Sequence, residues 1–218
     1  MCIRDRPGEV TLAHGGVLFL DELPEFNRAA IEALRQPLES SSVTIARAGG
    51  ALTFPADFQL IAAANPCPCG LGGADDRCTC TPEQIGRYAS RLSGALADRI
   101  DISVAVGQPD AGAMASDEPE SSAEVRERVV AARRIQRERW GSGVANATVA
   151  DELLRELAAP QRAALDALDE AQRAWGLSGR GWTRALRLAR TCADLEGEAE
   201  VTEDHVAVAL SLRGRVKR

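Results

Sequence analysis

The hydrophobic pattern begins with an unbroken apolar run at residues 16–20, which ends abruptly in Asp21 and Glu22. A run of this length beside glycines predicts a strand that is buried in a parallel sheet. Similar runs at residues 58–64 and 100–106 predict two more such strands. We therefore expect three neighbouring parallel strands.

Polar residues follow the first two of these strands directly. Asp21 and Glu22 end the first strand, and Asn65 ends the second. Parallel strands end at the same sheet edge, where open α/β sheets bind ligands, so Asp21 and Asn65 should lie close together. In nucleoside triphosphatases, such acids hold Mg²⁺ and orient the attacking water, and an Asn can contact the γ-phosphate or that water. The alternative is a strand with solvated acids at its end and an Asn that caps a turn.

The remaining pattern separates the chain into parts. Alternating positions around Gly49-Gly50 predict a β-hairpin over residues 43–54. A helix over residues 29–38, with Asn27 as its N-cap, should precede the hairpin. From residue 124 on, apolar positions recur only at helical spacing. We expect an α/β part at residues 1–107, a polar linker at 108–123 and a helical part at 124–218.

Composition limits the classes of partner. The chain has 218 residues, of which 45% are hydrophobic and 27% charged, which suits one large or two small globular units. Residues 1–123 carry 9 basic and 17 acidic side chains, and residues 124–218 carry 17 and 15. Any DNA contact must therefore be a local patch. No signal peptide or membrane-length apolar run is present, so we expect a cytoplasmic protein without membrane contact.

Lysine usage decides what kind of nucleotide site the chain can hold. Lys217 is the only lysine, and Arg218 follows it, so the sequence contains no GxxxxGK[ST] phosphate-binding loop. Residues 1–6 show no periodicity and lead directly into Pro7. The chain is therefore either a fragment or a degenerate domain, and its start favours a fragment. We expect that these six residues are foreign to the domain, that its first part is missing and that the chain alone binds ATP weakly or not at all.

Four of the six cysteines fall within fourteen positions, as Cys67, Cys69, Cys78 and Cys80. Two C-x-C pairs across a short loop can enclose a tetrahedral Zn²⁺. The chain has no secretory signal that would favour disulfides. We therefore expect a structural zinc site, with two disulfides or free thiols as the alternatives.

Longer segments carry a more specific signal; they read GVLFLDELPEF, AAANPCPCG, CTCTPEQIGRY, SRLSGALADRID and SGRGWTRALRLARTCADLEG. In this order they resemble the ComM/YifB family, the magnesium-chelatase-like bacterial AAA+ ATPases. The resemblance covers roughly residues 7–215. It implies a partial P-loop AAA+ core, which is a parallel sheet with helices, followed by an all-α C-terminal lid.

The resemblance also implies roles by position. Asp21 and Glu22 match the Walker B acids that serve ATP and Mg²⁺, with Asp21 as the Mg²⁺ ligand, and Asn65 matches sensor 1. Arg99 matches the arginine finger that is given to the neighbouring subunit, so its guanidinium should lie exposed at the subunit edge. Arg180 best matches sensor 2.

Arg184, one helical turn after Arg180, is the alternative match to sensor 2. The remaining implications concern partners. The hairpin matches a pore-facing hairpin, with Arg47 near its tip as the DNA-contacting residue. Proteins of this family are ATP-driven hexameric rings that act on DNA, and ComM-like members are implicated in branch migration during transformation. Two alternatives are a magnesium-chelatase-type ATPase subunit that remodels a partner, and a truncated fragment that cannot hydrolyse ATP.

Overall fold

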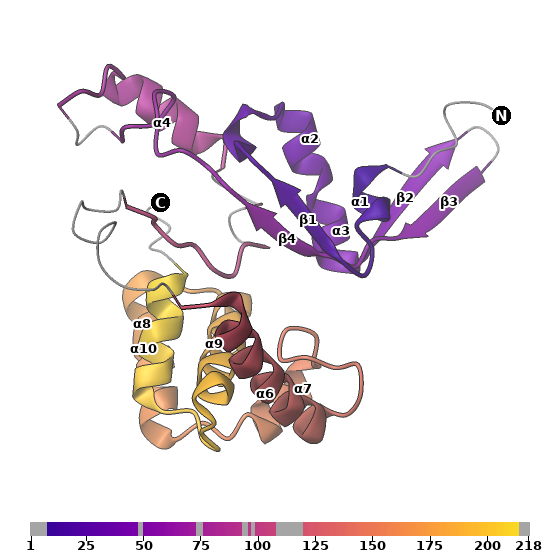
Figure 1. Ribbon diagram of the computed structural model, residues 1–218, viewed down its shortest axis with the longest axis vertical. Helices are drawn as coiled ribbons and strands as arrows, with labels where there is room; N and C mark the ends of the chain where they lie inside the picture. Colours follow the sequence, from indigo (N-terminus) through magenta and orange to yellow (C-terminus); the bar gives the residue numbers. More distant parts are fainter. Residues whose placement is uncertain are drawn as a thin grey trace. The chain divides into compact units, whose positions relative to one another are not determined.

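The computed structural model describes residues 8–47, 50–72, 76–92, 96, 99–107 and 120–213. The chain divides into two compact units, Met1–Ile100 and Asp101–Arg218. The first is an α/β unit, and the second consists of helices in its described part (Figure 1). The predicted fold class is therefore confirmed. The expectation for residues 1–6 lies outside the described residues, as does most of the expected linker.

The α/β unit is built from two small sheets and short helices. Its elements are α1 (Glu9–Leu12), β1 (Val17–Leu20), the 3₁₀ helix η2 (Leu23–Glu25), α2 (Arg28–Ala33), α3 (Arg35–Ser40), β2 (Ser42–Arg47), β3 (Gly50–Pro55), β4 (Gln59–Ala62) and α4 (Pro82–Ser90). The strands β2 and β3 pair antiparallel, as the predicted hairpin requires. This hairpin extends away from the β1–β4 sheet (Figure 1).

Strands β1 and β4 pair in parallel, with Leu20 opposite Ala62 at their carboxyl ends. Leu18 and Leu20 pack into the core with α2, α3 and the buried Leu96. The opposite face is open, because Phe19 is 59% exposed. The prediction that the first strand is buried on both faces is therefore wrong, since the described helices cover only one face of the sheet.

The predicted third strand is also absent from the described residues. Residues 101–107 form no strand, and Val106 is 91% exposed. The backbone N–H of Ser103 donates to the carbonyl of Leu212 over 2.6 Å, so this segment bonds to the end of a helix. An apolar run becomes a strand only when a neighbouring strand accepts its backbone hydrogen bonds.

The expected single helix over residues 29–38 is two helices. The Asn27 side chain accepts a hydrogen bond from Ala30 N, which confirms it as the N-cap of α2. Leu34 then ends α2 and precedes α3. Pro37 lies in the first turn of α3, where its missing N–H is not needed, so the proline favours a new helix start at this point.

The second unit contains five described helices: α6 (Ser122–Trp140), α7 (Asp151–Leu157), α8 (Arg162–Trp175), α9 (Gly179–Glu196) and α10 (Glu203–Leu212). Helix α9 packs against α6, α8 and α10. Its alanines and Leu186 form the centre of the core with Leu154 and Leu168. Among the described helices, none is long and apolar enough to cross a membrane.

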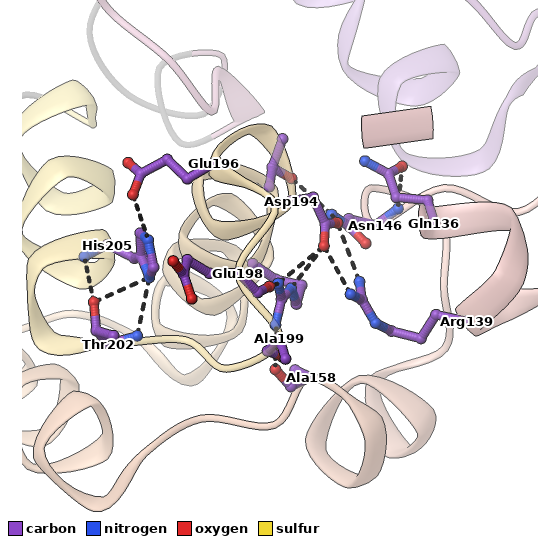
Figure 2. Close-up of polar contacts among 12 residues, drawn as sticks. Gln136, Arg139, Asn146, Ala158, Asp194, Glu196, Glu198, Ala199, Thr202 and His205 are labelled. Atoms are coloured by element: carbon purple, nitrogen blue, oxygen red, sulfur yellow. Dashed lines mark hydrogen bonds and ion pairs between the residues drawn. The ribbon is translucent and has the colours of Figure 1, made fainter. Parts of the chain in front are cut away.

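A buried polar network also fixes α9 (Figure 2). The carboxylate of Asp194, which is 1% exposed, accepts hydrogen bonds from Arg139, Arg190 and Asn146. The shortest joins Arg139 to Asp194 over 2.7 Å. Because Asp194 lies on α9 and Arg139 on α6, this carboxylate ties two helices together.

Arg190 is fully buried and uses its remaining donors on backbone carbonyls. It donates to Ala158 over 3.1 Å, to Ala199 over 2.8 Å and to Glu198 over 2.5 Å. Burial lowers the pKa of Arg190, and the nearby Asp194 carboxylate opposes this shift. The guanidinium therefore connects the loop that follows α9 to the residue that ends α7.

We expect Asp194→Ala to destabilise the helical unit by about 3–5 kcal/mol, because it leaves two guanidinium groups without their carboxylate. All three tryptophans lie in this unit, so urea unfolding followed by tryptophan fluorescence reports on it directly. Asp166→Ala is the control, since Asp166 forms an exposed pair with Arg162 and should contribute at most about 1 kcal/mol. Equal midpoints for the two variants would contradict the role of the network.

Candidate functional site

A tight turn at the carboxyl end of β1 carries the two candidate acids. Glu22 has a left-handed backbone, with φ 50° and ψ 42°. Its N–H donates to the Asp21 carboxylate over 2.9 Å. A left-handed conformation costs a residue other than glycine on the order of 1–3 kcal/mol, and such residues cluster at functional sites. Both side chains are exposed to solvent.

The rest of this turn is anchored in the core. Leu23 is 1% exposed, and its N–H donates to the carbonyl of Ala63 over 2.9 Å. The N–H of Ala63 in turn donates to the carbonyl of Leu20 over 2.9 Å. The turn is therefore hydrogen-bonded to the segment that follows β4. The strained backbone of Glu22 lies between strand β1 and Leu23, both of which bond to Ala63.

The segment with Asn65 leaves the sheet at the same edge. Leu20 and Ala62 are opposite each other in the parallel ladder, and Asn65 comes three residues after Ala62. The structure thus brings the segments that carry the acids and Asn65 to one end of the sheet. Carboxylates are the ligands that Mg²⁺ prefers, and an amide can hydrogen-bond to phosphate or water.

The four predicted cysteines converge. The Sγ atom of Cys67 lies 3.3 Å from that of Cys69 and 3.8 Å from that of Cys78, and all four sulfurs lie within 4.8 Å of one another. Cys67 is completely buried. Sulfurs placed about 2.3 Å from a tetrahedral ion lie roughly 3.8 Å apart, so the cluster has the size of a metal site.

The electrostatics of the cluster also suit a cation. The N–H of Gly72 donates to Cys67 Sγ over 3.2 Å and lowers the pKa of that thiol to about 6. The N–H of Leu71 lowers the pKa of Cys69. Burial raises the pKa of Cys80 to about 12, and the charge on Cys67 adds to this rise. Negative sulfurs this close repel one another, and a bound cation would remove that repulsion.

Arg99 lies differently from the expectation. Its side chain is only 11% exposed and forms an ion pair with Glu39 on α3. The predicted exposed guanidinium is therefore wrong for this chain, because Glu39 supplies a carboxylate within the same unit. This pair involves neither Asp21 nor Glu22.

The other predicted arginines belong to different elements. Arg180 is exposed in the first turn of α9, and Arg184 pairs with Asp101 over 3.4 Å. Both belong to the helical unit, whereas the acids belong to the α/β unit. Arg47 is the last residue of β2, and its side chain lies outside the described residues.

Two residues near α4 that the sequence did not reveal interact with the acid-bearing turn, one by a hydrogen bond and one through charge. Arg91, which follows α4, donates to the carbonyl of Pro24 over 2.9 Å. Tyr88 on α4 is 5% exposed; burial raises its pKa, and the charges of Glu25 and Glu22 add to the rise. The spacing of Tyr88 and Arg91, one helical turn apart, was the available signal, but it does not reveal a partner so distant in the sequence.

The chain matches one protein family along most of its length. Residues 2–114 match the family described as magnesium chelatase, subunit ChlI. Residues 119–213 match the C-terminal region of the same subunit. The two matches divide near the boundary between the α/β unit and the helical unit.

Individual relatives are similar over nearly the whole chain. The competence protein ComM of Haemophilus influenzae is 45% identical over 216 residues, which are 97% of this chain and 42% of that protein. The uncharacterized protein YifB of Escherichia coli is 42% identical over 210 residues, or 95% of this chain and 41% of that protein. An uncharacterized Mycobacterium tuberculosis protein is 44% identical over 210 residues, or 95% and 42%. The chain spans about two fifths of the length of these relatives.

We expect the cysteine cluster to bind one Co²⁺ per chain as a spectroscopic probe. Titration should give the intense sulfur-to-metal absorption of a tetrahedral thiolate site, and Zn²⁺ should displace Co²⁺ because it binds such sites more tightly. Cys67→Ser should weaken this absorption and the affinity for Co²⁺, because one of four thiolates is lost. Cys192→Ser is the matched control, since Cys192 lies in α9, and it should leave the spectrum unchanged. The same spectrum and affinity in Cys67→Ser as in the unsubstituted chain would refute the site.

Proposed function

Because this chain belongs to the magnesium chelatase subunit ChlI family, in the ComM and YifB group of AAA+-type ATPases, we propose that it supplies the water-activating and lid parts of an ATP-driven motor. The observation that carries the proposal is the strained turn of Asp21 and Glu22 at the carboxyl end of β1. Exposed acids at this end of a parallel sheet suit metal and phosphate chemistry.

The roles of the polar residues follow from their chemistry. Asp21 would hold Mg²⁺, directly or through water, and the metal would neutralise charge on the nucleotide phosphates. Glu22 would orient and polarise the attacking water, and Asn65 would contact that water or the γ-phosphate. Arg180, with Arg184 as the alternative, would contact the nucleotide from the lid. We place the phosphate cradle outside these 218 residues, which contain no GxxxxGK[ST] motif.

The proposed substrate of the motor is DNA. The competence protein ComM, which is 45% identical to this chain, supports a role in competence. We propose that the motor acts as a branch-migration helicase during uptake and recombination of transforming DNA. The β2–β3 hairpin offers Ile45 and Leu52, which are 39% and 54% exposed. In a ring of six copies, this hairpin would face the pore, with Arg47 as its DNA contact.

Two further assignments complete the proposal. The metal of the cysteine cluster is Zn²⁺, and its role is structural, because four thiolates leave no open position for water. Arg99 acts on the nucleotide of the neighbouring subunit, which requires a head-to-tail interface and release from Glu39. Such arginines contribute about 10³–10⁵ in kcat.

The proposal is tested in a chimera in which this chain replaces the matching segment of Haemophilus influenzae ComM. Glu22→Gln should retain ATP but not hydrolyse it, because the amide cannot polarise water as a carboxylate does. Arg99→Ala should be equally inactive. Mixing the two should restore DNA-stimulated ATPase activity, because about a quarter of the interfaces in random rings join an intact Glu22 to an intact Arg99.

The matched control is Glu83→Gln, which changes an exposed glutamate that pairs with Arg87 on α4. This chimera should hydrolyse ATP at the unsubstituted rate. If Glu22→Gln is as active as Glu83→Gln, the assignment of the catalytic acid is wrong. If each single variant is inactive and the mixture is inactive too, Arg99 does not act across an interface.

A further inference from the structure

Helix α4 connects the cysteine cluster to the turn that carries Glu22. Its N-cap, Thr81, follows Cys80 directly and forms a capping box with Gln84, with hydrogen bonds of 3.3 Å and 2.8 Å. The start of the helix is thus fixed one residue after a cysteine of the cluster. Its nine residues span about 13 Å at 1.5 Å per residue, so a displacement at one end is carried to the other.

The other end of α4 reaches the turn. The guanidinium of Arg91 donates to the carbonyl of Pro24 over 2.9 Å and lies 3.5 Å from the carboxylate of Glu25. The ion pair is half exposed and would contribute little by itself. The bond to Pro24 differs, because Pro24 is fully buried and belongs to the 3₁₀ helix that begins directly after Glu22.

Tyr88 also lies on α4, and it is 5% exposed. Burial raises the pKa of its phenol, and the charges of Glu25, Glu22 and Cys67 add to the rise. Helix α4 thus carries a buried phenol that is influenced by charges on the turn and in the cysteine cluster.

The turn needs support from outside its own backbone. The left-handed conformation of Glu22 is strained and persists only where surrounding contacts hold it. In one such contact, the N–H of Leu23 donates to the carbonyl of Ala63. In another, the guanidinium of Arg91 donates to the carbonyl of Pro24. The first comes from the sheet, whereas the second comes from the residue after α4, whose N-cap directly follows Cys80.

We propose that Arg91 is a positioning residue that couples metal binding at the cysteine cluster to the geometry of the Glu22 turn. When the cluster holds its metal, Cys80 fixes α4, and Arg91 holds the turn in place. Loss of the metal releases the start of α4, and Arg91 then no longer donates to the carbonyl of Pro24. The coupling rests on the proposed metal at the cysteines, and its effect on hydrolysis rests on the proposed role of Glu22.

Hydrogen exchange of the 218-residue chain tests the coupling without any nucleotide. In the Zn²⁺-loaded protein, peptides that cover residues 20–27 should be protected, because Leu23, Glu25 and Phe26 donate backbone hydrogen bonds. Removing Zn²⁺ with a chelator should lower this protection, because only the contact from the sheet then remains. The β2–β3 hairpin should keep its protection, which separates release of the turn from unfolding of the unit.

The variants separate coupling from simple support. Arg91→Ala should expose the turn even with one Zn²⁺ bound, whereas Arg91→Lys should restore part of the protection, because an ammonium can also donate to Pro24. Arg87→Ala is the matched control, since the guanidinium of Arg87 pairs with the exposed Glu83 on the same helix, and the substitution should change nothing. Unchanged protection in Arg91→Ala, or after Zn²⁺ removal, would overturn the proposal.

A kinetic measurement in the ComM chimera shows whether the turn matters for catalysis. Arg91→Ala should lower kcat by about 10²-fold and leave the KM for ATP unchanged, as expected for a misplaced catalytic group. Arg91→Lys should recover part of this loss. If the unsubstituted chimera is inactive, the proposed ATPase function is contradicted. The hydrogen-exchange experiment still decides whether Arg91 couples the cysteine cluster to the turn. An equal rise of KM in Arg91→Ala and Arg87→Ala would overturn the positioning role.

Discussion

The parallel pairing of β1 with β4 is the interaction on which the α/β unit depends. It places Leu20 opposite Ala62, so that the acidic turn and the segment with Asn65 leave the sheet at one edge. The same ladder continues through Ala63, which accepts from Leu23 and thereby holds the strained Glu22. If the register shifted by one residue, the apolar side chains of β1 would change faces, and the acids would lose their anchor.

The helical unit is fixed by a different kind of constraint. Its core is made of alanines, leucines and valines, and the buried carboxylate of Asp194 accepts hydrogen bonds from two guanidinium groups and an amide. Removing one partner of such a network is costly, so its members act as a unit. The first turn of this same helix carries Arg180, the residue that we propose contacts the nucleotide.

The sequence revealed features that depend on local order and missed those that depend on distant partners. The cap at Asn27, the hairpin and the cysteine cluster follow from short-range patterns, and the structure contains them. The strand expected after Arg99 does not form in the described residues, because the backbone N–H of Ser103 donates to the end of a helix and not to a strand. The pairing of Arg99 with Glu39, sixty residues away, has no local signal.

The central claim is that the carboxyl end of the β1–β4 pair is the metal–nucleotide site. It is tested most directly by electron paramagnetic resonance of Mn²⁺, used in place of Mg²⁺, with ATP and the ComM chimera. Asp21→Asn should lose the protein-bound Mn²⁺–ATP signal. Asp57→Asn, which changes a carboxylate near the amino end of β4, should retain it. An unchanged signal in Asp21→Asn, or its loss in Asp57→Asn alone, would contradict the claim.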